Sequence, residues 1–248
     1  AKAAAAADVV VLDLEDAVAP GAKEAARRAV RAADLDPART VVRLNPGGDE
    51  QRRDLDALAG TGFDVVMLAK AESAEQVRAL APLRVLALCE TARGVLAAAE
   101  LAAAGAAGLM WGAEDLLASL GGRGSRTPDG RYRDVARHAR SSVLLAAGAH
   151  GVPAVDAVFL DLHDLDGLRA EAAEAAATGF AAKASIHPAQ VPVVREAFRP
   201  PAAEVERARR LLAAAEGQRG VFAFEGRMVD APLLRHAERV LRAAGAPG

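Results

Sequence analysis

The sequence predicts an α/β protein, a parallel (β/α)₈ barrel, from two observations. Seven short apolar, β-branched segments recur along the 248 residues, and each is followed by a segment with helical period. Strands of this kind that alternate with helices are typical of a parallel sheet covered on both faces. The rival fold, an open doubly wound sheet, normally carries a glycine-rich phosphate turn after its first strand. Here that position reads LEDAVAPGA, without GxGxxG, which favours the barrel.

The predicted strands are residues 8–14, 40–45, 64–70, 84–90, 107–112, 154–160 and 180–187. The clearest predicted helices are residues 21–33, 73–81, 93–104 and 134–150. A (β/α)₈ barrel has eight strands, one more than the sequence predicts. Because the chain opens on AKAAAAA, which is typical of the end of a helix, we expect the first barrel strand to be missing from this chain.

The C-terminal part differs from a further β/α unit. Residues 200–217 predict a helix, and a short aromatic turn and another helix follow. We therefore expect a barrel domain over residues 1–199 and a C-terminal helical extension over residues 200–248.

The composition excludes several classes of protein. A hydrophobic content of 52% and a net charge of −2 indicate a soluble globular chain and give no sign of a nucleic-acid or membrane partner. No apolar run approaches the roughly 18 residues of a membrane span, and the N-terminus lacks a signal-peptide pattern. The single cysteine, Cys89, excludes an internal disulfide and fits a reducing cytoplasm.

Charged groups follow nearly every predicted strand, where barrel enzymes place their chemistry. In chain order they are Asp13, Glu15 and Asp16; Arg43 and Asn45; Lys70 and Glu72; Glu90; the turn Gly112-Ala113-Glu114-Asp115; and His187. Any one of these residues could have a purely structural role, but a structural role explains less well why so many strands end in charged groups at the same edge of the barrel. The sequence therefore predicts an active site at this rim.

Glu90 and Asp115 follow neighbouring strands and should face each other. Two ionised carboxylates about 4 Å apart would repel by about 4 kcal/mol at an effective dielectric constant of 20, and a divalent cation removes that cost. Mg²⁺ suits a site with one or two carboxylates and further oxygens from water and substrate. The alternative for Asp115 alone is that it caps the helix that begins at LLASL.

Arg43 stands inside an apolar strand, where an unpaired guanidinium is costly. It can form a buried salt bridge with Asp16 or Glu15, hold a substrate carboxylate or enolate oxygen, or do both. Lys70 suits a salt bridge at the rim, which also places it near a bound substrate, better than a Schiff base, because nothing nearby favours a lowered pKa.

Seven motifs in order resemble the citrate lyase β-subunit (CitE-like) branch of the HpcH/HpaI aldolase superfamily, in its stand-alone actinobacterial form. They are LDLEDAV, VVRLNP, LAKAES, CETARG, MWGAEDL, SIHPAQ and FEGRMVDAP. The resemblance covers residues 1 to about 244. The chain departs from it at the N-terminus, where family members usually have a strand resembling RS-x-L-F-V-P-G that borders the acyl-CoA pocket.

The resemblance implies Mg²⁺, with Mn²⁺ as an alternative, on Glu90 and Asp115, and a substrate-binding arginine at Arg43. It also implies that the backbone of the turn at residues 112–115 holds the carboxylate of an oxo acid. Family members form homotrimers or hexamers, in which Asp230 of the VDAP motif reaches the neighbouring subunit's active site. From the sequence alone, Asp230 would be assigned as a helix N-cap.

The expected activity is cleavage of a 3-hydroxyacyl-CoA to an acyl-CoA and an oxo acid, or the reverse Claisen-type condensation. Citramalyl-, malyl- and 3-hydroxy-3-methylglutaryl-CoA are candidate substrates. Asp230 would move the proton, Arg43 would steady charge on oxygen, and Glu15 and Asp16 would fix Arg43 and metal-bound water. Three alternatives remain open: a thioesterase using the same site, a citrate lyase β subunit acting on a carrier-bound thioester, and a non-catalytic scaffold.

Overall fold

The computed structural model describes residues 2–218 and 220–245. The chain divides into two compact units, Ala1–Val191 and Pro192–Gly248, and the boundary falls within helix α10 (Gln190–Phe198). Residues 1 and 248, the outer limits of the two predicted domains, lie outside the described residues.

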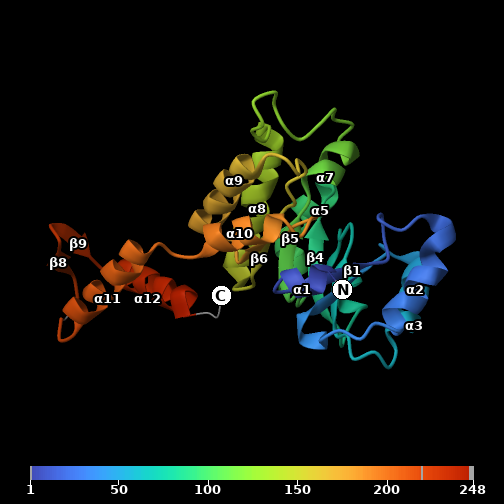
Figure 1. Ribbon diagram of the computed structural model, residues 1–248, viewed down its shortest axis with the longest axis horizontal. Helices are drawn as coiled ribbons and strands as arrows, with labels where there is room; N and C mark the ends of the chain where they lie inside the picture. Colours follow the sequence, from blue (N-terminus) through green and yellow to red (C-terminus); the bar gives the residue numbers. More distant parts are fainter. Residues whose placement is uncertain (1, 219, 246–248) are drawn as a thin grey trace. The chain divides into compact units, whose positions relative to one another are not determined.

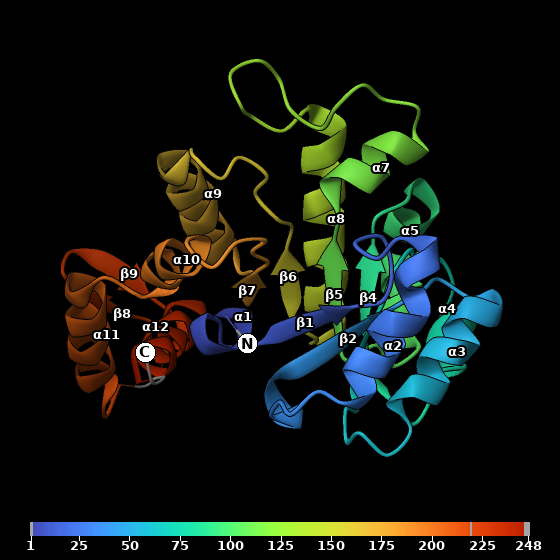
Figure 2. The same ribbon diagram turned by 45° about the vertical axis from the view of Figure 1, so that its right-hand side comes forward.

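The first unit is built on one parallel sheet (Figure 1). Its strands are β1 (Val10–Asp13), β2 (Thr40–Leu44), β3 (Val65–Leu68), β4 (Arg84–Cys89), β5 (Gly108–Trp111), β6 (Ala154–Asp156) and β7 (Ala182–Lys183). The order β1 to β7 confirms all seven predicted strands. Because β1 and β7 are the edges, the described residues form a curled half-barrel in place of the closed eight-stranded barrel (Figure 2).

Helix α1 (Lys2–Ala6) precedes β1, and helices follow most of the strands, as the alternating pattern predicted. The helices after the strands are α2 (Lys23–Arg31), α3 (Gly48–Leu58), α4 (Ala74–Arg78), α5 (Ala92–Leu96), α6 (Ala98–Ala103), α7 (Ala113–Ser119), α8 (Asp134–His150) and α9 (Leu165–Thr178). The predicted helix 93–104 is two helices, which meet at Ala97. Helices α2 and α3 pack side by side, and α8 packs along β5 and β6 (Figure 2).

The two faces of the sheet have different partners. One face lies under the helices and contributes fully buried side chains such as Val42, Val66 and Leu109. Alternate positions form a cluster on the opposite face, made of Val41, Met67, Leu88 and Met110 with partly buried neighbours. Because side chains alternate along a strand, Arg43 and Glu90 continue this second face beyond Val41 and Leu88. The alternation therefore brings the charged groups to one rim.

A buried ionic cluster joins β5, β6, β7 and α8. The Asp156 carboxylate, fully buried, accepts hydrogen bonds from Trp111 Nε1 at 2.7 Å, Arg140 Nε at 2.9 Å and Lys183 Nζ at 2.9 Å. Burial alone would raise the pKa of Asp156, but the hydrogen bond from Arg140 and the charge of Lys183 outweigh it and lower the pKa. The cluster fixes the last strands of the sheet to the helix layer.

The second unit has a small core of its own. Helices α11 (Ala202–Ala215) and α12 (Ala231–Gly245) pack against each other, and the antiparallel hairpin of β8 (Phe222–Phe224) and β9 (Arg227–Val229) packs on them (Figure 1). Val205, Leu211 and Val240 are among its buried side chains. The predicted order of helix, aromatic turn and helix is confirmed, and the turn is this hairpin.

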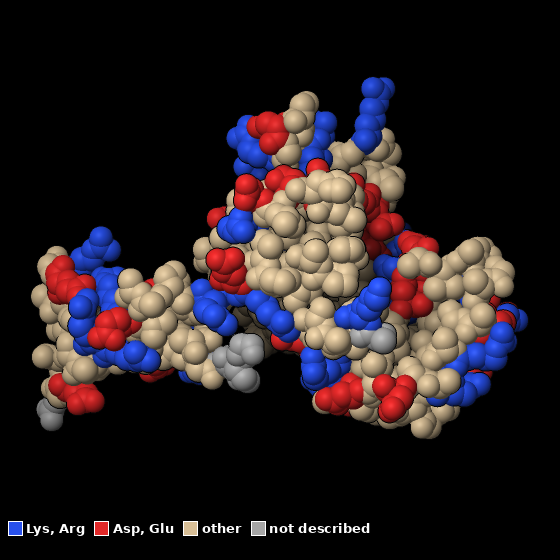
Figure 3. All heavy atoms as spheres, viewed as in Figure 1, with Lys and Arg blue, Asp and Glu red and all other residues tan. Residues whose placement is uncertain are grey.

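The surface carries both signs of charge. Lys and Arg side chains are interspersed with Asp and Glu over the visible face (Figure 3), in keeping with the net charge of −2. Among the described residues, no helix has the length and apolar character needed to cross a bilayer.

Replacing Asp156 by Ala should lower the free energy of unfolding by about 3 kcal/mol, because Arg140 would lose the carboxylate that pairs with it and the buried Lys183 would keep one of its two carboxylates, that of Glu171 at 2.8 Å. Since the folded pKa of Asp156 is depressed, its contribution is present above the unfolded pKa of about 3.9 and is lost as the pH falls below it. Urea denaturation at pH 7 and pH 3 measures both effects. Asp166→Ala, on an exposed helix turn, is the control; equal losses for the two variants would contradict the assignment.

Candidate active site

Arg43 is fixed by Asp13, which lies beside it in the register of β1 and β2. Arg43 Nε donates to Asp13 Oδ1 at 2.7 Å, a second guanidinium nitrogen contacts Asp13 Oδ2, and Nη1 lies 3.4 Å from Glu15 Oε2. Burial would lower the pKa of Arg43, but the hydrogen bonds and charge of Asp13 raise it. The predicted partner Glu15 is thus confirmed as a secondary contact, and Asp13 is the main one.

Glu15 and Asp16 meet Lys70. The Lys70 ammonium contacts Glu15 Oε1 and lies 2.9 Å from Asp16 Oδ2, while Glu15 Oε2 accepts the Asp16 N–H at 2.7 Å. Burial would lower the pKa of Lys70, but its hydrogen bonds to the two carboxylates raise it. Lys70 is therefore a cation at the rim, as the sequence indicated. Asp16 pairs with Lys70 in place of the predicted pairing with Arg43.

The backbone of Lys70 has φ of 49°, the left-handed region that residues with a side chain rarely adopt. In this conformation the Lys70 N–H donates to Glu90 Oε1 at 3.0 Å while the ammonium reaches Glu15. One residue thus contacts two buried carboxylates through different groups. Backbone strain of this kind concentrates at functional sites.

Glu90 is 3% exposed and lies directly after β4. Burial first, and then the negative charge of Asp115, raise the pKa of Glu90 to about 7. The approach of β5 depends on Gly112, because a Cβ there would lie 2.7 Å from the Glu90 Cβ and 3.0 Å from its Oε2. The structure therefore brings Glu90 and Asp115 together, as predicted, at a cost in like-charge repulsion.

Asp115 lies in the first turn of α7, whose N-cap is Gly112. The alternative that Asp115 caps a helix beginning at Leu116 is wrong, since the helix begins at Ala113. Glu114 points elsewhere: its Oε1 accepts a hydrogen bond from the buried Ser125 hydroxyl at 2.5 Å. The Gly112 N–H donates to the Cys89 carbonyl at 3.3 Å. The N–H groups of residues 113–115 lie in the first turn of α7, where the helix itself provides no acceptor for them.

The chemistry of this pair fits a divalent cation. Among the described residues, no group of three or more His, Cys, Asp or Glu side chains is arranged to hold a metal ion. A cation here would therefore have two carboxylates from the protein and would take its other oxygens from water and substrate, which is the pattern Mg²⁺ prefers. It would also relieve the repulsion that raises the pKa of Glu90.

Asp230 lies in the second unit, directly before α12. It is half-buried, and its carbonyl accepts the N–H groups of Leu233 at 3.1 Å and Leu234 at 3.3 Å. These contacts place it at the start of the helix, where the sequence alone put it.

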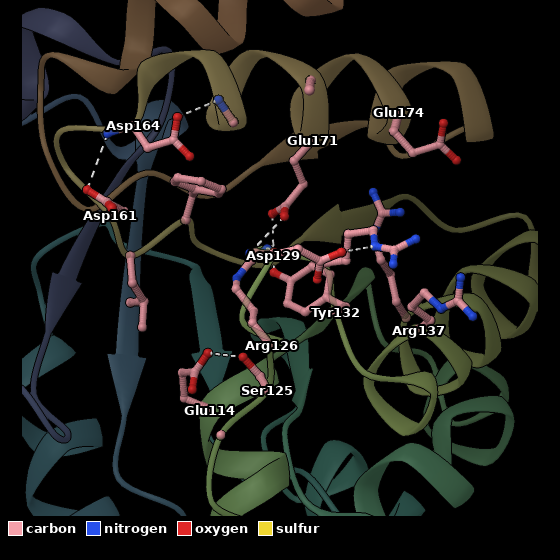
Figure 4. A pocket seen from close by; sticks show the side chains of 18 of the residues that line it. Glu114, Ser125, Arg126, Asp129, Tyr132, Arg137, Asp161, Asp164, Glu171 and Glu174 are labelled. Atoms are coloured by element: carbon pink, nitrogen blue, oxygen red, sulfur yellow. Dashed lines mark hydrogen bonds and ion pairs between the residues drawn. The ribbon is translucent and has the colours of Figure 1, made fainter.

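A large cavity lies beside α8 and α9. A pocket of about 1150 Å³ is bounded by α8, α9 and the segment between α7 and α8, and of the predicted site residues Glu114 lines it. Figure 4 shows Glu171 pointing toward Arg126, at 2.7 Å, and toward the Tyr132 hydroxyl, at 3.2 Å. The Arg126 guanidinium lies 3.8 Å from the centre of the Tyr132 ring. These contacts anchor the loop after α7 to α9, and they pair Arg126 with Glu171.

Sequence reasoning placed Asp13 and Asn45 at the rim without assigning either a specific partner. It missed three other residues that support the site: Lys23, Asp54 and Ser125. Asp13 and Arg43 stand opposite each other in the register of β1 and β2, which is fixed only when the two strands pair. The hydrogen bonds of Lys23 and Ser125 depend on tertiary packing, and the sequence carried no signal for them.

Comparisons with known proteins identify the family of this chain. The HpcH/HpaI aldolase/citrate lyase family matches residues 1–83 and 79–188. A citrate lyase subunit beta-like protein of Mycobacterium tuberculosis is 62% identical over 99% of this chain and 90% of its own length. A (3S)-malyl-CoA thioesterase of Cereibacter sphaeroides is 39% identical over 91% of this chain and 82% of its own length.

Solved structures of relatives match the fold of the chain. The crystal structure of CitE from M. tuberculosis in complex with magnesium, acetoacetate and coenzyme A matches with a TM-score of 0.93 at 62% identity, covering 98% of this chain and 92% of that one. A citrate lyase beta subunit from the same organism, complexed with oxaloacetate and magnesium, matches with a TM-score of 0.79 at 63% identity, covering 80% and 90%. The chain belongs to the HpcH/HpaI aldolase/citrate lyase family.

Proposed function

We propose that this protein is a magnesium-dependent carbon–carbon lyase that cleaves a 3-hydroxyacyl-CoA to an acyl-CoA and an oxo acid, or catalyses the reverse condensation. Citramalyl-, malyl- and 3-hydroxy-3-methylglutaryl-CoA are the candidate substrates. The observation that carries the proposal is the buried Glu90 carboxylate beside Asp115, at the rim that also holds Arg43 and Lys70. The magnesium, coenzyme A and oxo-acid complexes of the mycobacterial relatives support it.

Glu90 and Asp115 would hold Mg²⁺, and Mn²⁺ would suit the same oxygens. Bound there, the ion would act as a Lewis acid for a substrate oxygen and as a template for the oxo acid. The N–H groups of Ala113, Glu114 and Asp115, in the first turn of α7, would bind the substrate carboxylate.

Arg43 would steady negative charge on the substrate oxygen. Its side chain is 21% exposed, so part of the guanidinium faces solvent while Asp13 fixes its orientation. A guanidinium has five N–H donors, and its contacts with Asp13 and Glu15 leave donors for a substrate. Lys70 would add positive charge at the same rim, with Glu15 and Asp16 fixing its ammonium.

The reaction needs a base for the 3-hydroxyl proton. We assign this role to Asp230 of a neighbouring subunit, in a homotrimer or hexamer in the cytoplasm. Loss of that proton forms the new carbonyl as the C2–C3 bond breaks, and its electron pair becomes the thioester enolate. Proton return to C2 gives the acyl-CoA, and the other fragment is the oxo acid. An eighth strand between β1 and β7 would close the barrel around this site.

A thioesterase is the second candidate function, because a relative at 39% identity is a (3S)-malyl-CoA thioesterase. Hydrolysis of the thioester would release CoA and leave the hydroxy acid intact. Citrate lyase β subunits are related too, as the 35% identity to that of Haemophilus influenzae shows, so a carrier-bound thioester is the remaining alternative.

Product analysis separates these functions. The protein is incubated with each of the three hydroxyacyl-CoA candidates, with Mg²⁺ or with EDTA. We expect metal-dependent formation of an acyl-CoA together with a 2-oxo or 3-oxo acid. Free CoA with an intact hydroxy acid would show a thioesterase, and no turnover of any candidate would direct the search to carrier-bound substrates.

Replacing Asp115 by Asn should reduce Mg²⁺-dependent turnover by more than about 100-fold, because the change removes a charged ligand from the site. The far-UV circular dichroism should not change. Asp134→Asn, an exposed residue in the first turn of α8, is the matched control and should keep wild-type turnover. Unchanged turnover in Asp115→Asn would refute the ligand assignment.

The raised pKa of Glu90 predicts an unusual pH dependence of stability without metal. Since the folded protein holds this proton from pH 4.5 to about 7 and the unfolded chain does not, stability should fall as the pH rises through that window. A shift of this size corresponds to about 3 kcal/mol. Mg²⁺ at 100 times its dissociation constant should restore about 2.7 kcal/mol above pH 7.

Thermal unfolding in EDTA and in Mg²⁺, from pH 5 to pH 8, measures this dependence. Glu90→Gln should flatten the decline, whereas Glu100→Gln, an exposed residue on α6, should leave it as in the wild type. The same decline in Glu90→Gln would assign it to another group.

A further inference from the structure

Lys23 is the first residue of α2, where a cation is unfavourable because the N-terminus of a helix carries partial positive charge. Its ammonium nevertheless lies 2.8 Å from each of three acceptors: the Leu14 carbonyl, the Glu15 carbonyl and Asn45 Oδ1. An ammonium has three N–H donors, so each has an acceptor. None of these acceptors lies on the helix that carries Lys23.

Those acceptors belong to the ends of two strands. Leu14 and Glu15 directly follow β1, and Asn45 directly follows β2. Asn45 Nδ2 also donates to the Leu14 carbonyl at 2.8 Å. Lys23 and Asn45 therefore tie the end of β1 to the end of β2, at the point where the regular ladder stops.

Asn45 is in turn held by a buried pair. Its backbone N–H and Nδ2 donate to Asp54 Oδ2 at 2.8 and 2.7 Å, and Asp54 Oδ1 accepts from Arg27 Nε at 2.8 Å. Arg27 is one turn beyond Lys23 on the same helix. The contacts therefore form a closed ring from α2 through Asn45 and Asp54 back to α2, which fixes the amide so that its oxygen faces Lys23.

The ring acts on the rim through Glu15. Lys23 holds the Glu15 carbonyl, while the Glu15 carboxylate contacts Lys70 and approaches Arg43 to 3.4 Å. We propose that Lys23 is a positioning residue: it does not touch substrate, but it sets the backbone of Glu15 and thereby the orientation of Lys70 and Arg43. This inference rests on the proposed function for its effect on turnover.

The test compares Lys23→Met with Arg31→Met. Arg31 lies on the same helix and also donates to a carbonyl, that of Asp56 at 2.8 Å, but away from the rim. With the candidate hydroxyacyl-CoA that the wild type turns over, Lys23→Met should lower kcat by about 10- to 100-fold, since small misplacements of binding groups cost this much. Arg31→Met should stay within about twofold of the wild type.

A double-mutant cycle with Glu15→Gln separates positioning from general loss of stability. If Lys23 acts through Glu15, the double variant should have a kcat within about twofold of Glu15→Gln alone. Arg31→Met should combine with Glu15→Gln multiplicatively. A kcat for Lys23→Met equal to that of Arg31→Met, or multiplicative effects of Lys23→Met and Glu15→Gln, would overturn the proposal.

Two further measurements keep the test decisive. If Lys23→Met does not fold, Lys23→Arg replaces it and should still lower kcat, because a planar guanidinium cannot donate to three acceptors that converge on one point. Arg31→Lys is then its control, and a wild-type kcat in Lys23→Arg would overturn the proposal.

Amide hydrogen exchange supplies a readout without substrate. Exchange over residues 14–17 should accelerate in the Lys23 variant and not in the Arg31 control. This result tests whether the Lys23 ammonium holds the backbone of Glu15, even if the wild type turns over none of the candidates. A lack of turnover would refute the proposed function alone. Equal exchange in the two variants would overturn the proposal that Lys23 positions Glu15.

Discussion

Buried negative charge at the C-terminal rim of the sheet is the constraint on which the rest of the structure depends. Glu15 and Glu90 are both nearly inaccessible to water, and an isolated carboxylate in such a place is costly. Lys70 contacts both: its ammonium contacts Glu15 and its N–H contacts Glu90, which its left-handed backbone makes possible. Glu15 also has Arg43 nearby. Glu90 has Asp115 beside it, and that imbalance is what a divalent cation would correct.

Two kinds of polar cluster serve different ends in the first unit. Asp156, with Trp111, Arg140 and Lys183, ties the last strands to the helix layer and has its hydrogen bonds satisfied within the protein. At the rim, by contrast, burial and the charge of Asp115 raise the pKa of Glu90, so negative charge there is not balanced within the protein. A cluster with balanced charges stabilises the fold, whereas an unbalanced one leaves capacity for a cation. This difference argues for chemistry at the rim.

Much of this could be predicted from the sequence because periodicity and strand ends are local features. The seven strands and the convergence of Glu90 with Asp115 follow from apolar runs, most of which are followed closely by a charged residue. The strand lengths were overestimated at β6 and β7, the last two strands of the sheet that the described residues form. The partner of Arg43 was assigned to residues beyond the strand end, because the register that selects Asp13 is fixed only when two strands pair. The ring around Lys23 needs four separate segments at once, and no spacing in the sequence indicates it.

Gly112 shows how narrow the genetic options at such a site can be. The approach of β5 to Glu90 depends on the absence of one carbon atom, since any Cβ would overlap the Glu90 side chain. Every single-nucleotide missense change of a glycine codon encodes a residue that has this carbon. No single-nucleotide missense variant of the Gly112 codon therefore leaves the Glu90 carboxylate in its place. Purifying selection should act on every missense change at this codon.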